Sequence, residues 1–288
     1  MTFQKLAVIG CGLMGGSFAL GLKQAGIVKN IAGFSASEKT RRRAQQLQVI
    51  DVACDSVAQA VQGADIVLLA VPVSATRQSL EAIMPALSPN ALLMDVGSTK
   101  CDVVAAARET LGERLPCFVP AHPIAGKEVA GIEYAEGDLY QNRRTILTPL
   151  PETGTKQIEQ AQAVWQALGS TVFTLTPEEH DATFAAVSHL PHLLAFAAVN
   201  GLMAQAQGED FLRMAGPGFR DFSRIAGSDP AVWRDILSAN QAEVLSQMGY
   251  FKQALAQLED ALKSQDTQAL QSLITKASQV RSHWKLQA

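Results

Sequence analysis

Residues 6–16 read LAVIGCGLMGG, and this stretch decides the fold of the first half of the chain. A short apolar run ends in Gly10, Gly12 and Gly15, the G-x-G-x-x-G spacing of a strand-to-helix turn that binds a dinucleotide. A second apolar run, Asn30–Phe34, closes a βαβ unit of ordinary length. In this interpretation Gly10 permits the tight turn, Gly12 lets the backbone approach a pyrophosphate, and Gly15 lets the helix pack on the strand.

Apolar runs and helical patterns alternate along the first 175 residues. Most of the runs are apolar throughout, as in strands that are buried on both faces of a parallel sheet. The sequence therefore predicts an α/β fold for residues 1–175, a Rossmann-type doubly wound sheet. The expected strands are Leu6–Ile9, Ile31–Phe34, Ile66–Val71, Leu92–Val96, Phe118–Val119, Thr145–Leu147 and Val172–Leu175. The expected helices are Met14–Ala25, Ser37–Leu47, Ala75–Leu87 and Thr99–Leu111.

The pattern changes after Leu175, where strand-like runs stop and Ala and Leu dominate. Thr176, followed by a proline and two acids, is typical of a helix N-terminus. Apolar residues then recur at helical spacing in 248–262 and 270–284, on either side of a polar break. We expect an all-α domain, residues 176–288, that ends in a helical hairpin. Its apolar stripes either cover the domain's own core or pack against a second copy, and we favour a homodimer.

The composition indicates a soluble globular protein. Hydrophobic residues make up 48% of the chain and charged residues 18%, which excludes a disordered chain. The net charge of -3 gives no basic field for nucleic acid. The four cysteines are scattered without CxxC pairing, which suits a reducing compartment. The sequence shows neither an N-terminal signal pattern nor an uninterrupted apolar run long enough for a bilayer. We therefore expect a cytoplasmic protein without a membrane partner.

Ser35 stands where such a βαβ unit usually carries an Asp or Glu, about 20 residues after the glycine turn, to bind the ribose of NAD. An acid would repel the 2′-phosphate of NADP, whereas a hydroxyl can hydrogen-bond to it. Ser37 and Arg41, close by, favour NADP; if the arginines of this stretch form only a solvated helix face, NAD is the alternative. The candidate cofactor-binding residues are Gly10, Gly12, Leu13, Met14, Gly15, Ser35, Ser37, Arg41, Val71 and Pro72.

Two further motifs stand at the ends of strands, where ligands of open parallel sheets bind. Residues 96–100, VGSTK, place Ser98 there, either as a substrate ligand or as a cap of the next helix. Residues 122–128, HPIAGKE, follow the strand CFVPA and place His122 best of the five histidines for proton transfer. A lone histidine after a strand is structural as often as functional, but convergence with Ser98 at one sheet edge favours catalysis.

Histidines and arginines gather in the helical half. His189 and His192 lie three apart and share a helix face. Their spacing could suit a metal, but no third ligand of matching type lies near in the sequence, so we expect no metal site. Arg220 and Arg224 stand among aromatic residues, and a guanidinium is suited to bidentate capture of a carboxylate. A salt-bridged turn with Asp221 would explain the same pattern.

Together these segments resemble the prephenate/arogenate dehydrogenase family of tyrosine biosynthesis. The resemblance covers nearly the whole chain and rests on VIGCGLMGGS, AVPV, DVGSTK, HPIAGKE, SHLPH and FRDFSRIAGSDP, which appear in the family's order. It implies a Rossmann domain followed by a helical dimerisation domain. It also implies the oxidative decarboxylation of prephenate or arogenate, in which a hydride passes from the ring carbon bearing the 4-hydroxyl to the nicotinamide and CO2 leaves the ring.

The resemblance also implies roles for individual residues. His122 accepts a hydrogen bond from the 4-hydroxyl and assists its deprotonation, while Ser98 orients that hydroxyl and the histidine. Arg224 binds a substrate carboxylate and forms an ionic network with two acids, and Trp233 approaches the active site of the partner subunit. The candidate substrate-binding residues are Arg224, His192, Arg220, Glu128, Asp221, His189 and Trp233, where Glu128 and Asp221 are the two acids of the network.

Two other interpretations stay open. A β-hydroxyacid dehydrogenase or imine reductase joins similar domains but usually carries a catalytic lysine on the interdomain helix, where this chain has SHLPH. A non-catalytic NADP-sensing protein would keep the glycine turn without needing His122, Ser98 and Arg224 in one place. Within the resemblance, Ser35 matches the NADP-using members, whereas Ala36 replaces the arginine that often follows the serine in them.

Overall fold

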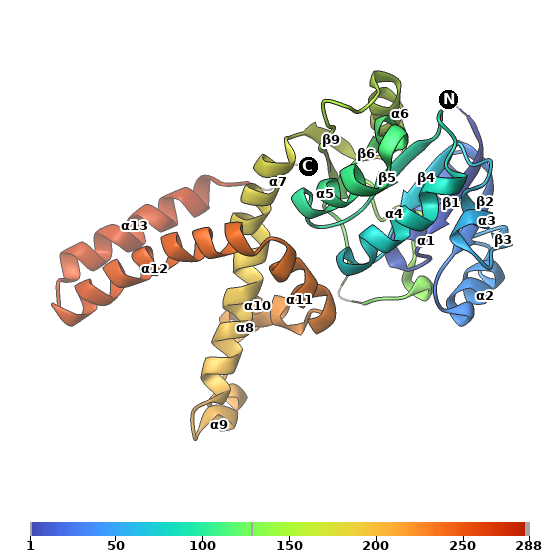
Figure 1. Ribbon diagram of the computed structural model, residues 1–288. Coiled ribbons are helices and arrows are strands. Elements are labelled where there is room, and N and C mark those ends of the chain that lie inside the picture. Colours follow the sequence, from blue (N-terminus) through green and yellow to red (C-terminus); the bar gives the residue numbers. More distant parts are fainter. Residues whose placement is uncertain (1, 128, 286–288) are drawn as a thin grey trace.

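A computed structural model describes residues 2–127 and 129–285 (Figure 1). Glu128, one of the candidate substrate ligands, lies outside the described residues. The described chain comprises an α/β domain and a set of helices that extends away from it (Figure 1). This division confirms the predicted fold class. The last strand ends at Thr174 and the first helix of the second part begins at Pro177.

The centre of the first domain is a six-stranded parallel sheet with the order β3-β2-β1-β4-β5-β6. This is the doubly wound order, which reverses next to β1 and leaves a ligand crevice at the carboxyl ends of the strands. The strands are β1 (Phe3–Ile9), β2 (Val28–Phe34), β3 (Val52–Ala53), β4 (Ile66–Leu69), β5 (Leu92–Asp95) and β6 (Phe118–Val119). The helices that connect them are α1 (Leu13–Gln24), α2 (Glu38–Gln46), α3 (Val57–Val61), α4 (Thr76–Ile83) and α5 (Cys101–Thr110).

Side chains of β1 alternate between two hydrophobic cores. Leu6 and Val8 pack into the core that includes Phe18 of α1, whereas Ala7 and Ile9 pack into the core that includes Leu80 of α4. Both faces of the sheet are therefore covered by helices, which explains why the strands read as continuous apolar runs.

A second, three-stranded sheet corrects the sequence analysis, which placed all strands in one sheet. It consists of β7 (Ala121–Pro123), β8 (Arg144–Leu147) and β9 (Thr171–Thr174), with β7 antiparallel and β9 parallel to β8. Pro120 separates β6 from β7, and because proline cannot donate to a ladder the main sheet ends there. Helix α6 (Thr155–Ala167) makes the crossover from β8 to β9. His122 consequently lies on a strand of the second sheet and not in a loop after the first.

The helical part is built on one long helical stretch. Its segments are α7 (Pro177–Phe184), the π-helix η5 (Ala185–His189) and α8 (Leu190–Met203). The shorter helices α9 (Gly208–Arg213), α10 (Pro217–Ser223), the 3-10 helix η6 (Arg224–Gly227) and α11 (Pro230–Ala239) follow. The predicted hairpin is confirmed as α12 (Gln241–Lys263) and α13 (Thr267–His283), two antiparallel helices that project from the body of the chain (Figure 1).

The stretch Pro177–Met203 is apolar as well as long. It has 27 residues, and its most apolar window has a mean hydropathy of 1.5 with only 28% of that window buried. By length and composition alone such a helix could cross a membrane, and core helices of soluble proteins meet the same criterion. The apolar residues of this stretch do not form an uninterrupted run, because Ser188, His189 and His192 stand among them.

Candidate active site

The glycine turn has the geometry that a dinucleotide requires. Gly10 has a φ of +103°, and a Cβ there would stand 2.1 Å from the carbonyl oxygen of Ala70. A Cβ on Gly15 would stand 2.2 Å from the carbonyl oxygen of Gly10, whereas one on Gly12 would meet nothing within 4 Å. Gly12 caps α1 without a side-chain hydrogen bond, and no acid occupies the first helical turn. The positive end of α1 is therefore open to an anionic ligand such as a pyrophosphate.

Ser35, at the end of β2, is tied to this turn. Its Oγ accepts a hydrogen bond from the backbone N–H of Cys11 at 2.7 Å. Arg41 Nη1 donates to the Ser35 carbonyl at 2.6 Å, and the guanidinium lies 5.5 Å from the centre of the Phe34 ring. Ser37 caps α2 by accepting from the N–H of Thr40. Ser35 and Arg41 therefore lie together at the end of β2, where a ribose would be bound.

His122 is partly exposed, and a second histidine lies against it. Its Nδ1 is 2.8 Å from Nε2 of His180, which is fully buried on α7. The ring of Phe184 packs edge-on against His122, with the ring centroids 4.8 Å apart. Within the described residues, His122 Nε2 makes no hydrogen bond, and this nitrogen is the one available to a substrate.

The buried contact continues from His180 to Asp181. His180 Nδ1 is 2.8 Å from Asp181 Oδ1, and the Asp181 carboxylate also accepts the backbone N–H groups of Lys100 and Cys101. Burial raises the pKa of Asp181, but the hydrogen bonds from His180 and from these backbone groups outweigh it and leave the pKa below its ordinary value. Burial lowers the pKa of His180 and, together with the charges of His180 and Lys100, holds the pKa of His122 well below the ordinary value. Both histidines are therefore neutral near pH 7.

A buried ion pair fixes the strand of His122 to the VGSTK loop. Lys100 Nζ contacts the carboxylate of Asp95 and donates to the carbonyl of Ala121 at 2.8 Å. The same carboxylate accepts the N–H of Ala121 at 2.9 Å and that of Gly97 at 2.8 Å. Because the charges are paired and both groups make further hydrogen bonds to the backbone, the cost of their burial is offset. The pair therefore fixes Ala121, which precedes His122, in position relative to Gly97, which precedes Ser98.

His189 serves the same loop from the helical side. It is buried, and Asn240 Nδ2 lies 3.1 Å from its Nδ1 while also donating to the carbonyl of Asp181 at 2.8 Å. Burial lowers the pKa of His189 to about 4, against an opposing hydrogen bond with the backbone of Ser98. Because His189 is buried and its Nδ1 contacts Asn240, it supports this part of the site from the helical side.

His192, on α8, and Trp233, on α11, form a stacked pair. Their ring centroids are 3.5 Å apart with 20° between the planes. His192 Nδ1 donates to the carbonyl of Ser188, so Nε2 faces away from its own helix turn. Burial and the charge of Arg224 lower the pKa of His192. Arg224 is exposed at the start of η6, which packs against α8. The π-helix η5 lies between His180 and His192, and π-turns are frequent where side chains must converge on a site.

Two other candidates are not part of this cluster. Arg220 and Asp221 are both exposed on α10 and pair with each other at 3.1 Å. The resemblance assigned Asp221 to an ionic network with Arg224. Among the interactions of the described residues, its ion-pair partner is instead Arg220. Trp233 lies against His192 of its own chain. No group of three or more metal-ligating side chains occurs within residues 2–127 and 129–285.

Sequence reasoning missed the residues behind His122. His180 and Asp181 come from the start of α7, and Asn240 from the end of α11. The signal was present in TPEEHDATF, where a histidine and an acid follow each other just before an apolar helix. That signal does not tell which strand the pair will meet, since the contact with His122 spans 58 residues.

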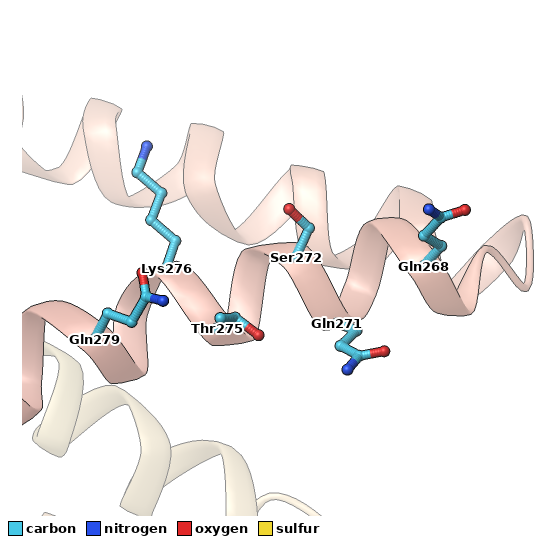
Figure 2. A pocket seen from close by; sticks show the side chains of 6 residues that line it. All are labelled: Gln268, Gln271, Ser272, Thr275, Lys276 and Gln279. Carbon is cyan, nitrogen blue, oxygen red and sulfur yellow. The ribbon is translucent and has the colours of Figure 1, made fainter.

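An open depression on α13 is separate from all of these residues. Figure 2 shows that polar side chains line it, and they are Gln268, Gln271, Ser272, Thr275, Lys276 and Gln279. It lies on the projecting hairpin, away from the sheet (Figure 1).

Comparison with known proteins decides the family. The model of the prephenate dehydrogenase nucleotide-binding domain matches residues 18–183, and that of the prephenate dehydrogenase dimerization domain matches residues 176–276. The chain belongs to the prephenate dehydrogenase family. The first match includes His122, His180 and Asp181, and the second includes Arg224 and Trp233. The recognition made from the motifs is therefore confirmed.

Relatives and solved structures agree with this assignment. The chain is 34% identical to the cyclohexadienyl dehydrogenase of Zymomonas mobilis over 270 residues, 92% of this chain and 90% of that one. It is 34% identical to the prephenate dehydrogenase of Bacillus subtilis, over 92% of this chain and 72% of that one. The structure of A. aeolicus prephenate dehydrogenase with hydroxyphenyl propionate and NAD+ superposes with a TM-score of 0.92 at 34% identity, covering 98% of both chains. The chain is thus an oxidoreductase of the prephenate/cyclohexadienyl dehydrogenase type, with a nucleotide-binding and a dimerization domain.

Proposed function

We propose that this chain catalyses the oxidative decarboxylation of prephenate to 4-hydroxyphenylpyruvate, with hydride transfer to NADP. The observation that carries the proposal is the state of His122. It is neutral near pH 7, its Nδ1 is occupied by His180, and its Nε2 is open, as a general base requires. The relatives named prephenate and cyclohexadienyl dehydrogenase support the substrate class.

The residues of the turn fit a nicotinamide dinucleotide. The pyrophosphate would lie at the start of α1 above Gly12, and Val71, whose N–H is close to Gly10, would lie along the cofactor. When bound, the nicotinamide supplies the hydride acceptor. NADP is proposed over NAD because Ser35 replaces the usual acid and Arg41 is held next to it. The A. aeolicus relative was solved with NAD+, so the preference in this chain is a matter for direct assay.

The protein's own groups would then act on the substrate. Arg224, on the 3-10 helix η6 that packs against α8, would bind a substrate carboxylate, because a guanidinium pairs with a carboxylate in a defined orientation. His122 Nε2 would accept the proton of the 4-hydroxyl as the hydride leaves C4. The C–C bond to the ring carboxylate then breaks, CO2 departs, and its electron pair completes the aromatic ring. The proton on His122 returns to the phenolate oxygen.

Three further points belong to the proposal. Arogenate, which carries an amino group in place of the keto group, is proposed as a second substrate, in line with the cyclohexadienyl dehydrogenase relative. A homodimer is proposed from the match to a dimerization domain and from the exposed apolar side chains of the hairpin. A cytoplasmic location is proposed because none of the four cysteines forms a disulfide.

An initial-rate assay with four combinations tests the proposal: prephenate or arogenate, each with NADP or NAD, followed by the absorbance of the reduced nicotinamide. Turnover of prephenate with a clear preference for NADP is the expected result. Equal or better turnover with NAD would show that Ser35 is merely permissive and that the cofactor assignment is wrong. No turnover with any pair would overturn the proposed reaction and reopen the imine-reductase and sensor interpretations.

A further inference from the structure

His180 and Asp181 form a hydrogen-bonded chain that begins at His122. All four contacts in it are short: 2.8 Å from His122 to His180, 2.8 Å from His180 to Asp181, and 2.8 and 2.9 Å from the backbone N–H groups of Lys100 and Cys101 to Asp181. His180 and Asp181 are 0% and 2% exposed, so water does not compete for these bonds. The chain therefore has a defined arrangement of protons.

The proton positions follow from the fixed end of the chain. The N–H groups of Lys100 and Cys101 can only donate, so the Asp181 carboxylate is held as an ionised acceptor at the start of α5. His180 Nδ1 lies on an oxygen of that carboxylate and must carry the proton of the neutral ring. His180 Nε2 is then a lone pair, and His122 Nδ1, 2.8 Å away, must donate to it. His122 Nε2 is then the one nitrogen of the two rings whose lone pair accepts no hydrogen bond from the described residues.

We propose that His180 and Asp181 are positioning residues that hold His122 in the tautomer with its proton on Nδ1, so that Nε2 is always the nitrogen which accepts the proton of the substrate hydroxyl. The inference rests on the proposed function for its kinetic consequence, but the tautomer is a property of the protein alone. Without this support, a neutral imidazole in water populates both tautomers, and one of them presents an N–H to the hydroxyl and cannot act as base.

The same chain stabilises the charge that forms on the base. When Nε2 takes a proton, His122 becomes an imidazolium whose Nδ1–H bond to His180 strengthens. His180 in turn donates to an anion that the N-terminus of α5 keeps ionised. Lys100 acts in the opposite sense, since its charge lowers the pKa of both histidines and keeps them neutral before reaction. The negative charge of Asp181 therefore fixes the tautomers before the reaction and stabilises the imidazolium as the proton is transferred.

A matched pair of substitutions at His180 separates this role from a packing role. His180→Phe keeps a ring against Phe184, whose centroid lies 4.5 Å from that of His180, but removes both hydrogen bonds. His180→Gln keeps an amide oxygen that can accept from His122 Nδ1 and an amide N–H that can donate to Asp181. Asp181 keeps its two backbone donors in both variants.

The first readout is independent of turnover. Nitrogen-15 NMR of histidine-labelled protein without substrate, with the His122 signals assigned by comparison with His122→Asn, reports which ring nitrogen carries the proton. Wild type and His180→Gln are expected to show protonated Nδ1 on His122, and His180→Phe a mixture of tautomers. A wild-type His122 with its proton on Nε2 would overturn the inference even if the enzyme turns prephenate over.

The second readout is kinetic. His180→Phe is expected to lower kcat by about 10²-fold or more, with KM changed little, because only the base is misaligned. His180→Gln is expected to restore most of that loss. Equal losses in both variants with the His122 tautomer unchanged, or a folded His180→Phe enzyme with normal kcat, would assign the pair to packing alone. If His180→Phe fails to fold, the tautomer of His122 in the wild type, together with the tautomer and kcat of His180→Gln, still tests the proposal. If the wild type does not turn prephenate over, the proposed reaction is wrong, but the NMR result on the His122 tautomer is unaffected.

Discussion

The backbone N–H of Cys11 donates to the side-chain oxygen of Ser35 across 2.7 Å, so the end of β2 is bonded directly to the glycine turn. The residue that would contact the ribose is thus also a support of the loop that would contact the pyrophosphate. This explains why a serine can stand where an acid is usual: its oxygen accepts the loop N–H, and its hydroxyl hydrogen remains able to donate to a phosphate.

Ser35→Asp should reverse the cofactor preference. An aspartate keeps an acceptor for Cys11 but brings a negative charge to the 2′-phosphate, and a like-charge contact costs several kcal/mol. We expect kcat/KM with NADP to fall by roughly 10²-fold or more, and kcat/KM with NAD to stay the same or rise. Steady-state kinetics with both cofactors measures this. An unchanged ratio of the two values would remove Ser35 from the ribose site.

His122→Asn should abolish most turnover while leaving binding intact. Asparagine cannot accept the hydroxyl proton as an imidazole does, and general-base catalysis contributes about 10²–10⁴-fold to rate. Turnover is measured by reduced-nicotinamide absorbance, and cofactor binding by fluorescence titration or by the rise in melting temperature. A variant that keeps wild-type kcat would show that another group is the base.

Arg224→Gln should raise KM for prephenate far more than Arg220→Gln does. Both side chains are exposed, but the charge of Arg224 acts on the pKa of His192, whereas Arg220 is paired with Asp221 on α10. A charge-assisted bond to a carboxylate contributes about 1.5–3 kcal/mol, so we expect KM to rise by about 10–100-fold for Arg224→Gln and by less than about 2-fold for Arg220→Gln. Equal effects on KM would contradict the assignment of the substrate carboxylate to Arg224.

The free energy of unfolding should fall as the pH drops from about 6.5 to about 4. Burial lowers the pKa of His189 to about 4, so in this range the unfolded chain binds a proton that the folded chain does not. Each such histidine contributes a slope of up to about 1.4 kcal/mol per pH unit. Urea denaturation over this range is expected to show a smaller slope for His189→Gln, and His283→Gln controls for the loss of an exposed histidine. A slope unaltered by His189→Gln would contradict the assignment.

Substitutions on the hairpin should dissociate the proposed dimer. Leu255 on α12 and Val280 on α13 are 51% and 69% exposed, and α13 buries no residue within the chain. A charge in an apolar interface is left unpaired and desolvated. Leu255→Glu and Val280→Glu are therefore expected to sediment as monomers at concentrations where wild type and Lys252→Glu, a change at an exposed polar position, sediment as dimers. A monomeric wild type would overturn the dimer.

The sequence predicted those parts of the fold that local patterns determine. Continuous apolar runs marked β1, β2, β4 and β5 because helices cover both faces of their sheet. The two-residue strand β3 and the strand Ala121–Pro123 lack such a pattern, since the latter contains a histidine and a proline. Strands β8 and β9 belong to a separate sheet because they pair with each other and with β7. The residues of a strand do not show which other strand it will pair with, so the sequence could not predict this.

The candidate site shows the same limit. The glycine turn and His122 could be found because their spacing or position relative to a strand carries the chemistry. His180 and Asp181 could not, because their partners are set by how the second domain packs on the first. Lys100 is part of the motif VGSTK, but the sequence did not show that this lysine joins the ends of two strands. That role is seen from its contacts with Asp95 and Ala121.

Asp181 has a consequence for how this protein can be divided and recombined. It sits four residues beyond Pro177, where the helical part begins, yet it completes the N-terminus of α5 in the other domain. A hybrid enzyme joined at residue 175 would take His122 from one parent, and His180 and Asp181, which support it, from the other. Chimaeras that keep residues 176–183 with the nucleotide-binding half, the span where the two family matches overlap, would inherit all three from a single parent.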